Sequence, residues 1–451
     1  MKKRTIFISI LLLSNLFIIP TTAVDATHTS DLALNHIIEN VPYISQETSF
    51  YCLFACPTMA INYYQVKNNV TLQDVLYASG VGYTLIYSHP SYNRVPIGGN
   101  GGAWWNLDRM FLAELFGLTY TEASIDTSSI DQELCWNVCW MKIKENITDN
   151  KPVIVQVDPL FLPSFINPVL IELGLEKLHI PNSLLQCTTT GFFHVVLLTG
   201  FDETSNTVVY NDPMAALFGH PQEGIYATIS IDHLKQAMIN AARNNTIRFG
   251  SFTDNDISPL NENELFLKAH HRNIEKIKGN PSVYDPNLLT LCPNLYGINV
   301  LAQLLQDLEG LNNQVHTALI YQCTNTYLLN PFFNIIFLIS DRFFPQIFKM
   351  TDWQAFSNYY YQLSVEKHNI SQYLLLKSNQ FNDSKLVALC RYESDLLQQE
   401  SMLWEKVSSY FNEFMKKGVF ISLPTSIHLL NEMKKTVSNI QIIQESMIQG
   451  I

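Results

Sequence analysis

The sequence changes character near residue 258, and this change constrains the fold more than any other feature. From Asn40 to about Phe252, helical and strand patterns occur in the same part of the chain. After Ser258, apolar residues recur at three- and four-residue spacings over long stretches, as is typical of amphipathic helices. A chain of 451 residues is long enough for about two or three domains. We therefore expect an α+β domain followed by an all-α domain.

Within the first region, helical patterns come before strand patterns. Apolar residues at helical spacing predict helices over 52–64 and 104–115. Runs rich in β-branched residues predict strands over 152–157, 192–201 and 207–210. Helices followed by strands indicate an α+β fold rather than a regular alternation of the two.

In the second region, four apolar faces predict helices. They are formed by Leu301, Leu304, Leu305 and Leu308, by Trp353, Phe356, Tyr360 and Leu363, by Leu396, Leu403, Val407, Phe411 and Phe414, and by Leu430, Met433, Val437 and Ile440. The polar stretch 261–281 separates these helices from the first region. We divide the chain into a signal peptide (1–26), the α+β domain (27–257), a linker (258–285) and the helical domain (286–451).

The first residues resemble a secretion signal. Lys2, Lys3 and Arg4 precede an apolar run over 5–19, and small residues suitable for cleavage follow over 21–26. We expect a secreted or extracytoplasmic protein. The alternative is an uncleaved anchor, the only membrane contact that we expect, although the run is shorter than the ~20 residues of a typical span.

The charge and cysteine content exclude some classes of protein. Lys and Arg number 28 against 40 Asp and Glu, a net charge of -12, so we expect no nucleic-acid partner. Eight cysteines are too few for a disulfide scaffold, although some would pair in an oxidising compartment. They are Cys52, Cys56, Cys135, Cys139, Cys187, Cys292, Cys323 and Cys390.

Gln46 and Cys52 form the first half of a candidate catalytic site. Cys52 begins a predicted helix, where unpaired N–H groups and the helix dipole stabilise a thiolate, the nucleophilic form of cysteine. Gln46 lies six residues earlier. Its amide and the Cys52 backbone N–H would supply the hydrogen-bond donors that an oxyanion needs in acyl transfer.

His194 and Asp212 form the second half. His194 begins one predicted strand, and the next strand leads to Asp212 after a turn over 202–206. Both residues therefore lie at the open end of one hairpin, although the sequence does not fix its register. Asp212 would orient and charge-stabilise the His194 imidazole, which would take the proton of the Cys52 thiol.

Structural explanations compete with each of these roles. Cys52 would also fit as a buried helix cysteine and His194 as a core histidine. Cys56, one turn after Cys52, fits a core position, a disulfide or a competing nucleophile. Cys52, Cys56, Cys135 and Cys139 have spacings from which a zinc site can be imagined, but the proposed chemistry needs no metal or other cofactor. The Pro-punctuated segment 159–186 is a candidate lid.

Several short motifs, in a fixed order along the chain, resemble a known family. Residues 40–46, with Cys52, Ala55 and Met59, and then Phe193–Asp202 and Val209–Pro213 resemble papain-like cysteine peptidases of the bacteriocin leader-processing, or double-glycine peptidase-like, type. The resemblance implies a papain-like domain within 27–257. It also implies that Cys52 is the nucleophile, His194 the base, Asp212 the orienting residue and Gln46 the oxyanion donor.

A second resemblance reaches into the helical region. Residues 151–158, 161–163 and 294–298 are similar to the butirosin biosynthesis protein H group, which joins a papain-like domain to a helical one. That group implies acyl transfer to an amine, whereas export favours hydrolysis, because a secreted protein would not ordinarily meet an acyl carrier protein.

These patterns together favour an exported thiol hydrolase that cleaves a peptide or small-molecule amide bond through a thioester on Cys52. The acyltransferase is the first alternative. An inactive papain-like binding module is the second, because Leu53 stands where the family normally has glycine after the nucleophile. The sequence does not identify the partner of the helical domain.

Overall fold

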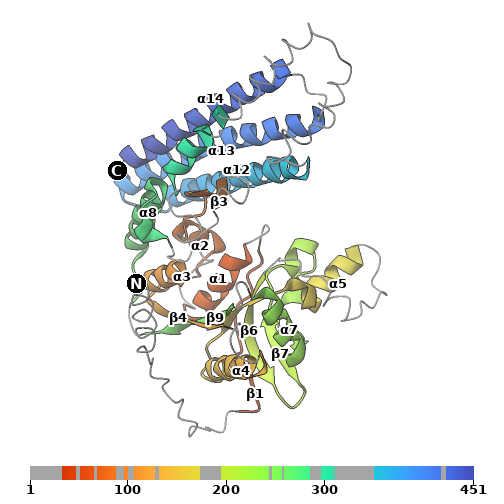
Figure 1. Ribbon diagram of the computed structural model, residues 1–451. Helices are drawn as coiled ribbons and strands as arrows, with labels where there is room; N and C mark the ends of the chain where they lie inside the picture. Colours follow the sequence, from red (N-terminus) through yellow and green to blue (C-terminus); the bar gives the residue numbers. More distant parts are fainter. Residues whose placement is uncertain are drawn as a thin grey trace, which may run out of the picture.

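A computed structural model shows the fold of the protein (Figure 1). It describes residues 33–46, 51–65, 69–87, 96–99, 106–126, 132–172, 194–242, 246–255, 258–284, 296–306, 308–309, 350–417 and 423–450. The predicted signal peptide and most of the predicted lid, from residue 173 onward, lie outside these ranges. Among the described residues, no helix has an apolar stretch long enough to cross a membrane.

The first half of the described chain is organised around an antiparallel sheet of seven strands. Six of them follow the order β4-β9-β5-β6-β7-β8, and β1 pairs with β6. The strands are β1 Asn35–Ile37, β4 Leu118–Asp126, β5 Val153–Val157, β6 His194–Asp202, β7 Thr207–Asn211, β8 Ala227–Ser230 and β9 Thr246–Asp254. A separate hairpin joins β2 (Thr84–Tyr87) to β3 (Pro96–Gly99).

Helices cover both faces of this sheet. The α1 and α4 helices lie on opposite sides of it (Figure 1), and every residue of β6 except the last is buried. The helices of this half are α1 Cys52–Tyr64, α2 Leu72–Ala78, α3 Asn106–Leu115, α4 Gln132–Thr148, α5 Pro163–Glu172 and α7 Ile231–Ala241. Short 3-10 turns are η2 Pro159–Phe161, η3 Ala215–Phe218, η4 Pro221–Gly224 and η5 Pro281–Val283. The predicted α+β class is confirmed.

The predicted elements around the candidate site agree closely with the structure, whereas the edge of the sheet was not predicted. Helix α1 spans the predicted residues, and β5, β6 and β7 match their predicted strands to within two residues at each end. Strands β4 and β9 pair along nine residues each. Their sequences lack long β-branched runs, and β4 is half exposed, which weakens the strand pattern.

Three long helices dominate the second half: α12 Met350–Ser378, α13 Ser384–Lys417 and α14 Leu423–Gln449. They lie side by side in Figure 1. Several of the predicted apolar positions meet in one apolar cluster. Tyr360 and Val437 belong to this cluster, and Leu403, which precedes Trp404, packs against it. Residues 298–306 are also helical and contribute Leu301 and Leu304 to that cluster.

Paired serines hold α12 against α13. Ser357 faces Ser408, Ser364 faces Ser401 and Ser371 faces Ser394, with Oγ to Oγ distances of 3.0, 3.2 and 3.1 Å. In each pair, at least one hydroxyl also donates to the carbonyl of its partner. Because serine is small and satisfies its own hydroxyl here, the two backbones can pack closely.

The stretch predicted as a linker contains an ordered helix, α8 (Glu262–Lys278). Asn261 and Glu264 form a capping box at its start, and Gly279 ends it in a left-handed conformation with φ of 74°. Buried residues Phe266 and Ile277 lie in the same apolar cluster as the sheet. The high polarity of this stretch concealed an amphipathic helix, one face of which is buried.

Residues of the helical half also enter the core of the sheet half. Ile370 and Leu374 of α12 and Leu397 of α13 are fully buried members of the cluster that contains β5 and β6. The two halves therefore share one apolar core. The exact boundaries of the predicted domains stay a prediction.

Buried polar side chains from the helical half hold the loop after α2. Asn273 and Lys276 of α8 donate to the carbonyls of Tyr77 and Ser79 at 2.9 and 2.7 Å. Lys367 of α12 donates to the carbonyl of Gly82. These bonds satisfy carbonyls that would otherwise be buried without donors, so the loop is fixed by helices that follow it by about 190 residues or more.

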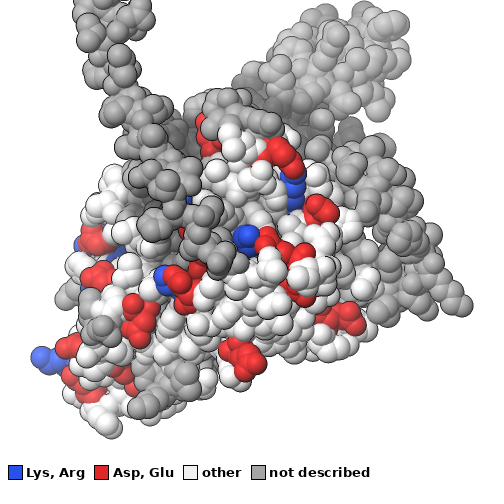
Figure 2. Space-filling view, turned by 90° about the horizontal axis from the view of Figure 1, so that it is seen from below, with Lys and Arg blue, Asp and Glu red and all other residues white. Residues whose placement is uncertain are grey.

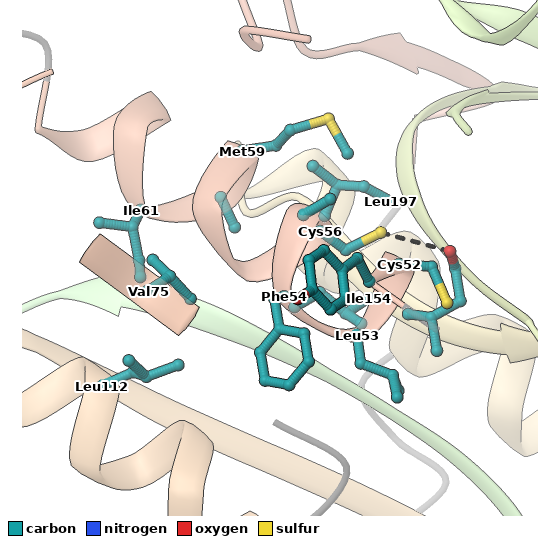
Figure 3. Close-up of a cluster of buried hydrophobic side chains, with 14 of the residues drawn as sticks. Cys52, Leu53, Phe54, Cys56, Met59, Ile61, Val75, Leu112, Ile154 and Leu197 are labelled. Carbon is teal, nitrogen blue, oxygen red and sulfur yellow. Dashed lines mark hydrogen bonds between the residues drawn. The ribbon is translucent and has the colours of Figure 1, made fainter. Parts of the chain in front are cut away.

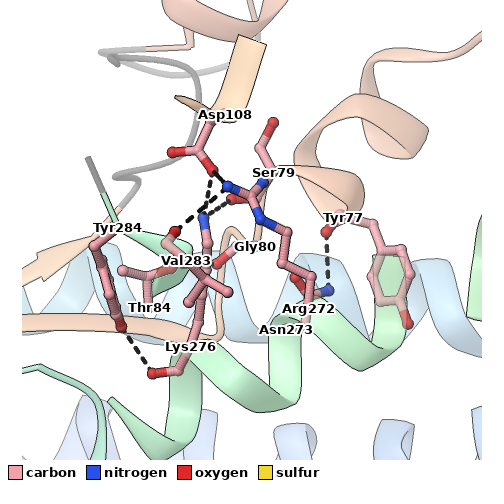
Figure 4. Close-up of polar contacts among 10 residues, drawn as sticks. All are labelled: Tyr77, Ser79, Gly80, Thr84, Asp108, Arg272, Asn273, Lys276, Val283 and Tyr284. Carbon is pink, nitrogen blue, oxygen red and sulfur yellow. Dashed lines mark hydrogen bonds and ion pairs between the residues drawn. The ribbon is translucent and has the colours of Figure 1, made fainter. Parts of the chain in front are cut away.

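A buried ionic cluster lies at the same junction, and we call it the Asp108 cluster. It consists of Asp108 on α3 with Arg272 and Lys276 on α8, at 2.6 and 2.8 Å (Figure 4). Burial is the main cause that lowers the pKa of Lys276 to about 8, and Arg272 adds to it, although Asp108 acts in the opposite direction.

The acidic composition is visible at the surface. On the face shown in Figure 2, acidic side chains are spread over several areas, with basic side chains beside some of them. This face shows no continuous basic area, and the absence of a nucleic-acid partner stays a prediction.

Candidate active site

The structure brings Cys52, His194 and Asp212 together. His194 is the first residue of β6, and Asp212 directly follows β7. Because Leu197 pairs with Asn211, both residues lie at the same end of the hairpin, as predicted. The His194 Nε2 and Asp212 Oδ1 atoms are 2.6 Å apart, and both side chains are fully buried.

Cys52 is the first residue of α1 and contacts the His194 imidazole. The pKa of His194 responds to both the charge and the hydrogen bond of Cys52. Since Asp212 engages Nε2, Nδ1 is the ring nitrogen that remains for the Cys52 thiol. The first turn of α1 contains no acidic residue, and no side chain caps it. The positive end of this helix is therefore available to a thiolate.

The electrostatics of the site favour an imidazolium. Burial works against the charged form of His194, but Asp212 and then Cys52 outweigh it and raise its pKa to about 10. Burial likewise opposes the charged form of Asp212. The charge of His194 and hydrogen bonds from His194, Ser164 and Met214 prevail and lower the pKa of Asp212. The pair is thus held as imidazolium and carboxylate.

Asp212 is held by residues that the sequence analysis did not identify. Its Oδ2 accepts a hydrogen bond from Ser164 Oγ at 2.6 Å, and its Oδ1 accepts one from the Met214 N–H at 2.8 Å. Its carbonyl accepts one from the Tyr43 hydroxyl at 2.9 Å. These partners are 2 to 169 residues away in sequence, so no local motif identifies Ser164 or Tyr43.

A close backbone approach also fixes Asp212. Its N–H donates to the Gly224 carbonyl at 2.8 Å. A Cβ atom added at Gly224 would lie 2.2 Å from the Asp212 carbonyl oxygen, far inside van der Waals contact. Glycine is therefore required where η4 packs against the site.

Gln46 lies beside the loop that follows Asp212. Its N–H donates to the Pro213 carbonyl at 3.0 Å, and its side chain is buried. Residues 47–50, which join Gln46 to the helix of Cys52, lie outside the described residues. Its place next to Pro213 puts Gln46 on the side of the site that carries Asp212.

Cys56 and Leu53 differ from Cys52 in their surroundings. The Cys56 thiol donates to the Val195 carbonyl at 3.3 Å (Figure 3), and burial raises its pKa well above the ordinary value, with added effects of Cys52 and Asp212. Cys56 is thus held as a thiol, which makes it a poor nucleophile. Leu53 is 2 % exposed and packs in the main apolar cluster.

Among the described residues, the other cysteines form neither a disulfide nor a metal site. Cys135, Cys139 and Cys390, like Cys52 and Cys56, are thiols rather than halves of disulfides. Within the described ranges, no group of three or more His, Cys, Asp and Glu side chains is placed to hold a metal ion. Cys187, Cys292 and Cys323 lie outside those ranges.

A comparison with family models agrees with this geometry. Residues 38–228 match the model of the Peptidase_C39 like family. The match contains Cys52, His194 and Asp212, and it supports a papain-like domain of the C39 peptidase type in this part of the chain. No curated protein matches the chain. The finer resemblance to the butirosin biosynthesis protein H group stays a prediction.

Proposed function

We propose that the C39-type domain is a thiol hydrolase that cleaves a peptide or small-molecule amide bond after export. One observation carries this proposal: Cys52 lies at the start of a helix beside His194, whose other ring nitrogen is 2.6 Å from Asp212. A nucleophile, a base and a group that orients the base are the requirements of nucleophilic acyl transfer.

In the proposed reaction, the Cys52 thiolate attacks the amide carbonyl and forms a carbon–sulfur bond. Gln46 and the Cys52 N–H stabilise the oxyanion. Protonated His194 then gives its proton to the departing amine, and the carbon–nitrogen bond breaks to leave a thioester. Water then attacks the thioester carbonyl while neutral His194 takes a proton from this water molecule. The carboxylic acid leaves, and the thiolate and imidazolium are restored.

Transfer of the acyl group to an amine is the alternative. It uses the same residues but replaces water with an amine in the second step. The core that α12 and α13 share with the sheet half favours a functional unit larger than the peptidase domain alone. A helical part that merely followed the domain would not need to contribute buried residues to it.

An inactive binding module is the second alternative. This alternative arose because Leu53 is larger than the glycine that normally follows the nucleophile in the family. That side chain packs in the main apolar cluster, so its size does not by itself argue against catalysis.

The test is to incubate the full chain with a panel of peptide and small-molecule amides, with and without amine acceptors. Mass spectrometry would follow both the products and any acyl group on Cys52. We expect cleavage, a thioester on Cys52 that hydroxylamine removes, and neither in Cys52→Ala. An acyl-amine product would favour the transferase. Equal turnover by Cys52→Ala would refute the proposed chemistry.

A further inference from the structure

We propose that Ser164 is a positioning residue for this reaction and that, with Tyr210 behind it, it fixes the Asp212 carboxylate in the orientation that holds His194. The inference rests on the function proposed above. Ser164 does not reach the reacting atoms, and it acts through Asp212.

The number of protons determines the direction of the hydrogen bonds. Ser164 Oγ lies 2.6 Å from Asp212 Oδ2 and 2.8 Å from the Tyr210 hydroxyl. An ionised carboxylate only accepts hydrogen bonds, so the single hydroxyl proton of Ser164 goes to Asp212. Tyr210 must then donate to Ser164. The result is a directed chain from Tyr210 through Ser164 to Asp212, in which each bond strengthens the next.

The fold makes this chain specific. Tyr210 lies in β7, Asp212 directly follows this strand, and the side chains of both reach the Ser164 hydroxyl. Ser164 comes from α5, which packs against η3 and η4, the turns that follow Asp212. All three side chains are buried, so water does not replace a missing partner easily.

The two oxygens of Asp212 have different tasks. Oδ1 faces His194 and also accepts the Met214 N–H, whereas Oδ2 is held by Ser164. Without Ser164, one oxygen of a buried carboxylate loses its donor. The charged form of Asp212 becomes less favourable, so the carboxylate stabilises the His194 imidazolium less.

The titratable groups around Asp212 come from several elements. His194 is the cation, and it links Asp212 to Cys52. The others are the hydroxyls of Tyr43 and Tyr210 and the thiol of Cys56, whose pKa values are all raised. The carboxylate of Glu223 contributes to the raised pKa of Tyr210. Of these groups, His194 is the one cation, and it is hydrogen-bonded directly to Asp212, so a change at Ser164 should affect the His194–Asp212 pair first.

The test is the rate of Cys52 alkylation by iodoacetamide between pH 4 and pH 9, measured on the full chain by mass spectrometry. In Ser164→Ala, we expect the acid limb of the rate profile to move upward by about one pH unit. The rate on that limb falls by about tenfold. Ser164→Thr keeps a hydroxyl and restores the profile. Tyr210→Phe moves it in the same direction by less.

The matched control is Ser251→Ala. Ser251 is also a buried serine of the sheet half, but its hydroxyl donates to Asn146 at 2.8 Å and does not touch Asp212. We expect it to keep the profile of the unmodified protein. Thermal unfolding of each variant shows whether it is folded.

The outcomes separate this inference from the proposed function. If alkylation of Cys52 depends on His194 but its profile is the same in Ser164→Ala, the inference alone is wrong. If Ser164→Ala does not fold, an unchanged profile in Tyr210→Phe contradicts the inference. If alkylation of Cys52 does not depend on His194 at all, the proposed function fails and the inference with it.

Discussion

Asp212 and Asp108 are two of several buried carboxylates that pair with basic side chains in the described part of the chain, and of these two only Asp212 lies beside a nucleophile. Asp212 contacts His194 at 2.6 Å, while Asp108 contacts Arg272 and Lys276 at 2.6 and 2.8 Å. Both are almost inaccessible to solvent. By burial and ion pairing alone, the two sites look alike.

The difference is in what the cation can do. Arg272 and Lys276 close the Asp108 cluster between α3 and α8 and donate onward to backbone carbonyls, so they hold two parts of the chain together. His194 instead presents a second ring nitrogen to Cys52. A buried ion pair alone therefore indicates a structural role, and it becomes a candidate catalytic site only where its cation is the conjugate acid of a base that can take the proton of a nucleophile.

The largest effect expected is on stability, in Asp108→Ala. It leaves Arg272 and Lys276 as buried cations without a carboxylate, which costs about 3–5 kcal/mol of the free energy of unfolding. Urea unfolding would measure this. The control is Asp149→Ala, because the Asp149 ion pair with Lys151 is exposed, and we expect a loss below about 1 kcal/mol. A stable Asp108→Ala variant that had lost Cys52 reactivity would reverse our assignment of the two sites.

The next largest effect is on reactivity, in Asp212→Asn. The amide keeps the shape of the side chain but removes the negative charge that favours imidazolium. The Cys52 thiolate should then lose its imidazolium partner, so we expect its alkylation rate at pH 6 to fall by about 100-fold. The rate is measured by quenching the iodoacetamide reaction at set times and quantifying labelled Cys52 by mass spectrometry. An unchanged rate would mean that Asp212 does not support the base.

The two sites should also give opposite pH dependences of stability between pH 8 and pH 10. The pKa of His194 is raised from 6.5 to about 10, so its contribution is complete below pH 6.5 and is lost as the pH rises through 10. The pKa of Lys276 is lowered from 10.5 to about 8, so the unfolded chain binds more protons in this window and stability rises with pH. Each slope is at most about 1.4 kcal/mol per pH unit.

Two variants separate these slopes. Relative to the unmodified protein, the free energy of unfolding should rise more between pH 8 and pH 10 in His194→Ala and fall more in Lys276→Met. Asp108 keeps Arg272 as a partner in the second variant. Urea unfolding at four pH values is sufficient, and slopes that change in the same direction in both variants would contradict the comparison.

The smallest effect is expected for Cys56→Ala. Cys56 lies one turn from Cys52, but its thiol donates to a carbonyl and its pKa is raised. Alkylation of Cys52 should stay within about twofold, because truncation removes one thiol hydrogen bond and no charge. Loss of all labelling in this variant would identify Cys56 as the reactive cysteine.

Cys52, His194 and Asp212 could be placed from the sequence because each of them begins or directly follows a secondary structure element. Cys52 starts a helix, His194 starts a strand and Asp212 follows one, so local patterns alone place them. The hairpin register could not be predicted, because the pairing shifts by one residue between Leu198 and Gly200. Such a bulge leaves no clear signal in the sequence.

Long-range contacts account for what the sequence did not reveal. Ser164 lies in a segment that we expected to be a lid, yet it reaches Asp212 from 48 residues away. The segment of helix α8 was predicted to be a linker because the stretch 261–281 is polar, although its capping box is visible in the sequence. The serine pairs between α12 and α13 recur every seven residues, but serine alone does not indicate what it faces.

The central claim is that His194 activates Cys52, and cysteine-resolved alkylation of the full chain with iodoacetamide tests it most directly. Rates for Cys52 and for the other cysteines would be mapped by mass spectrometry at pH 6 and pH 8, in the unmodified protein and in His194→Ala. We expect Cys52 to react fastest, at nearly equal rates at the two pH values, and to slow by about 100-fold at pH 6 without His194. A Cys52 rate that is the same with and without His194 would contradict the account.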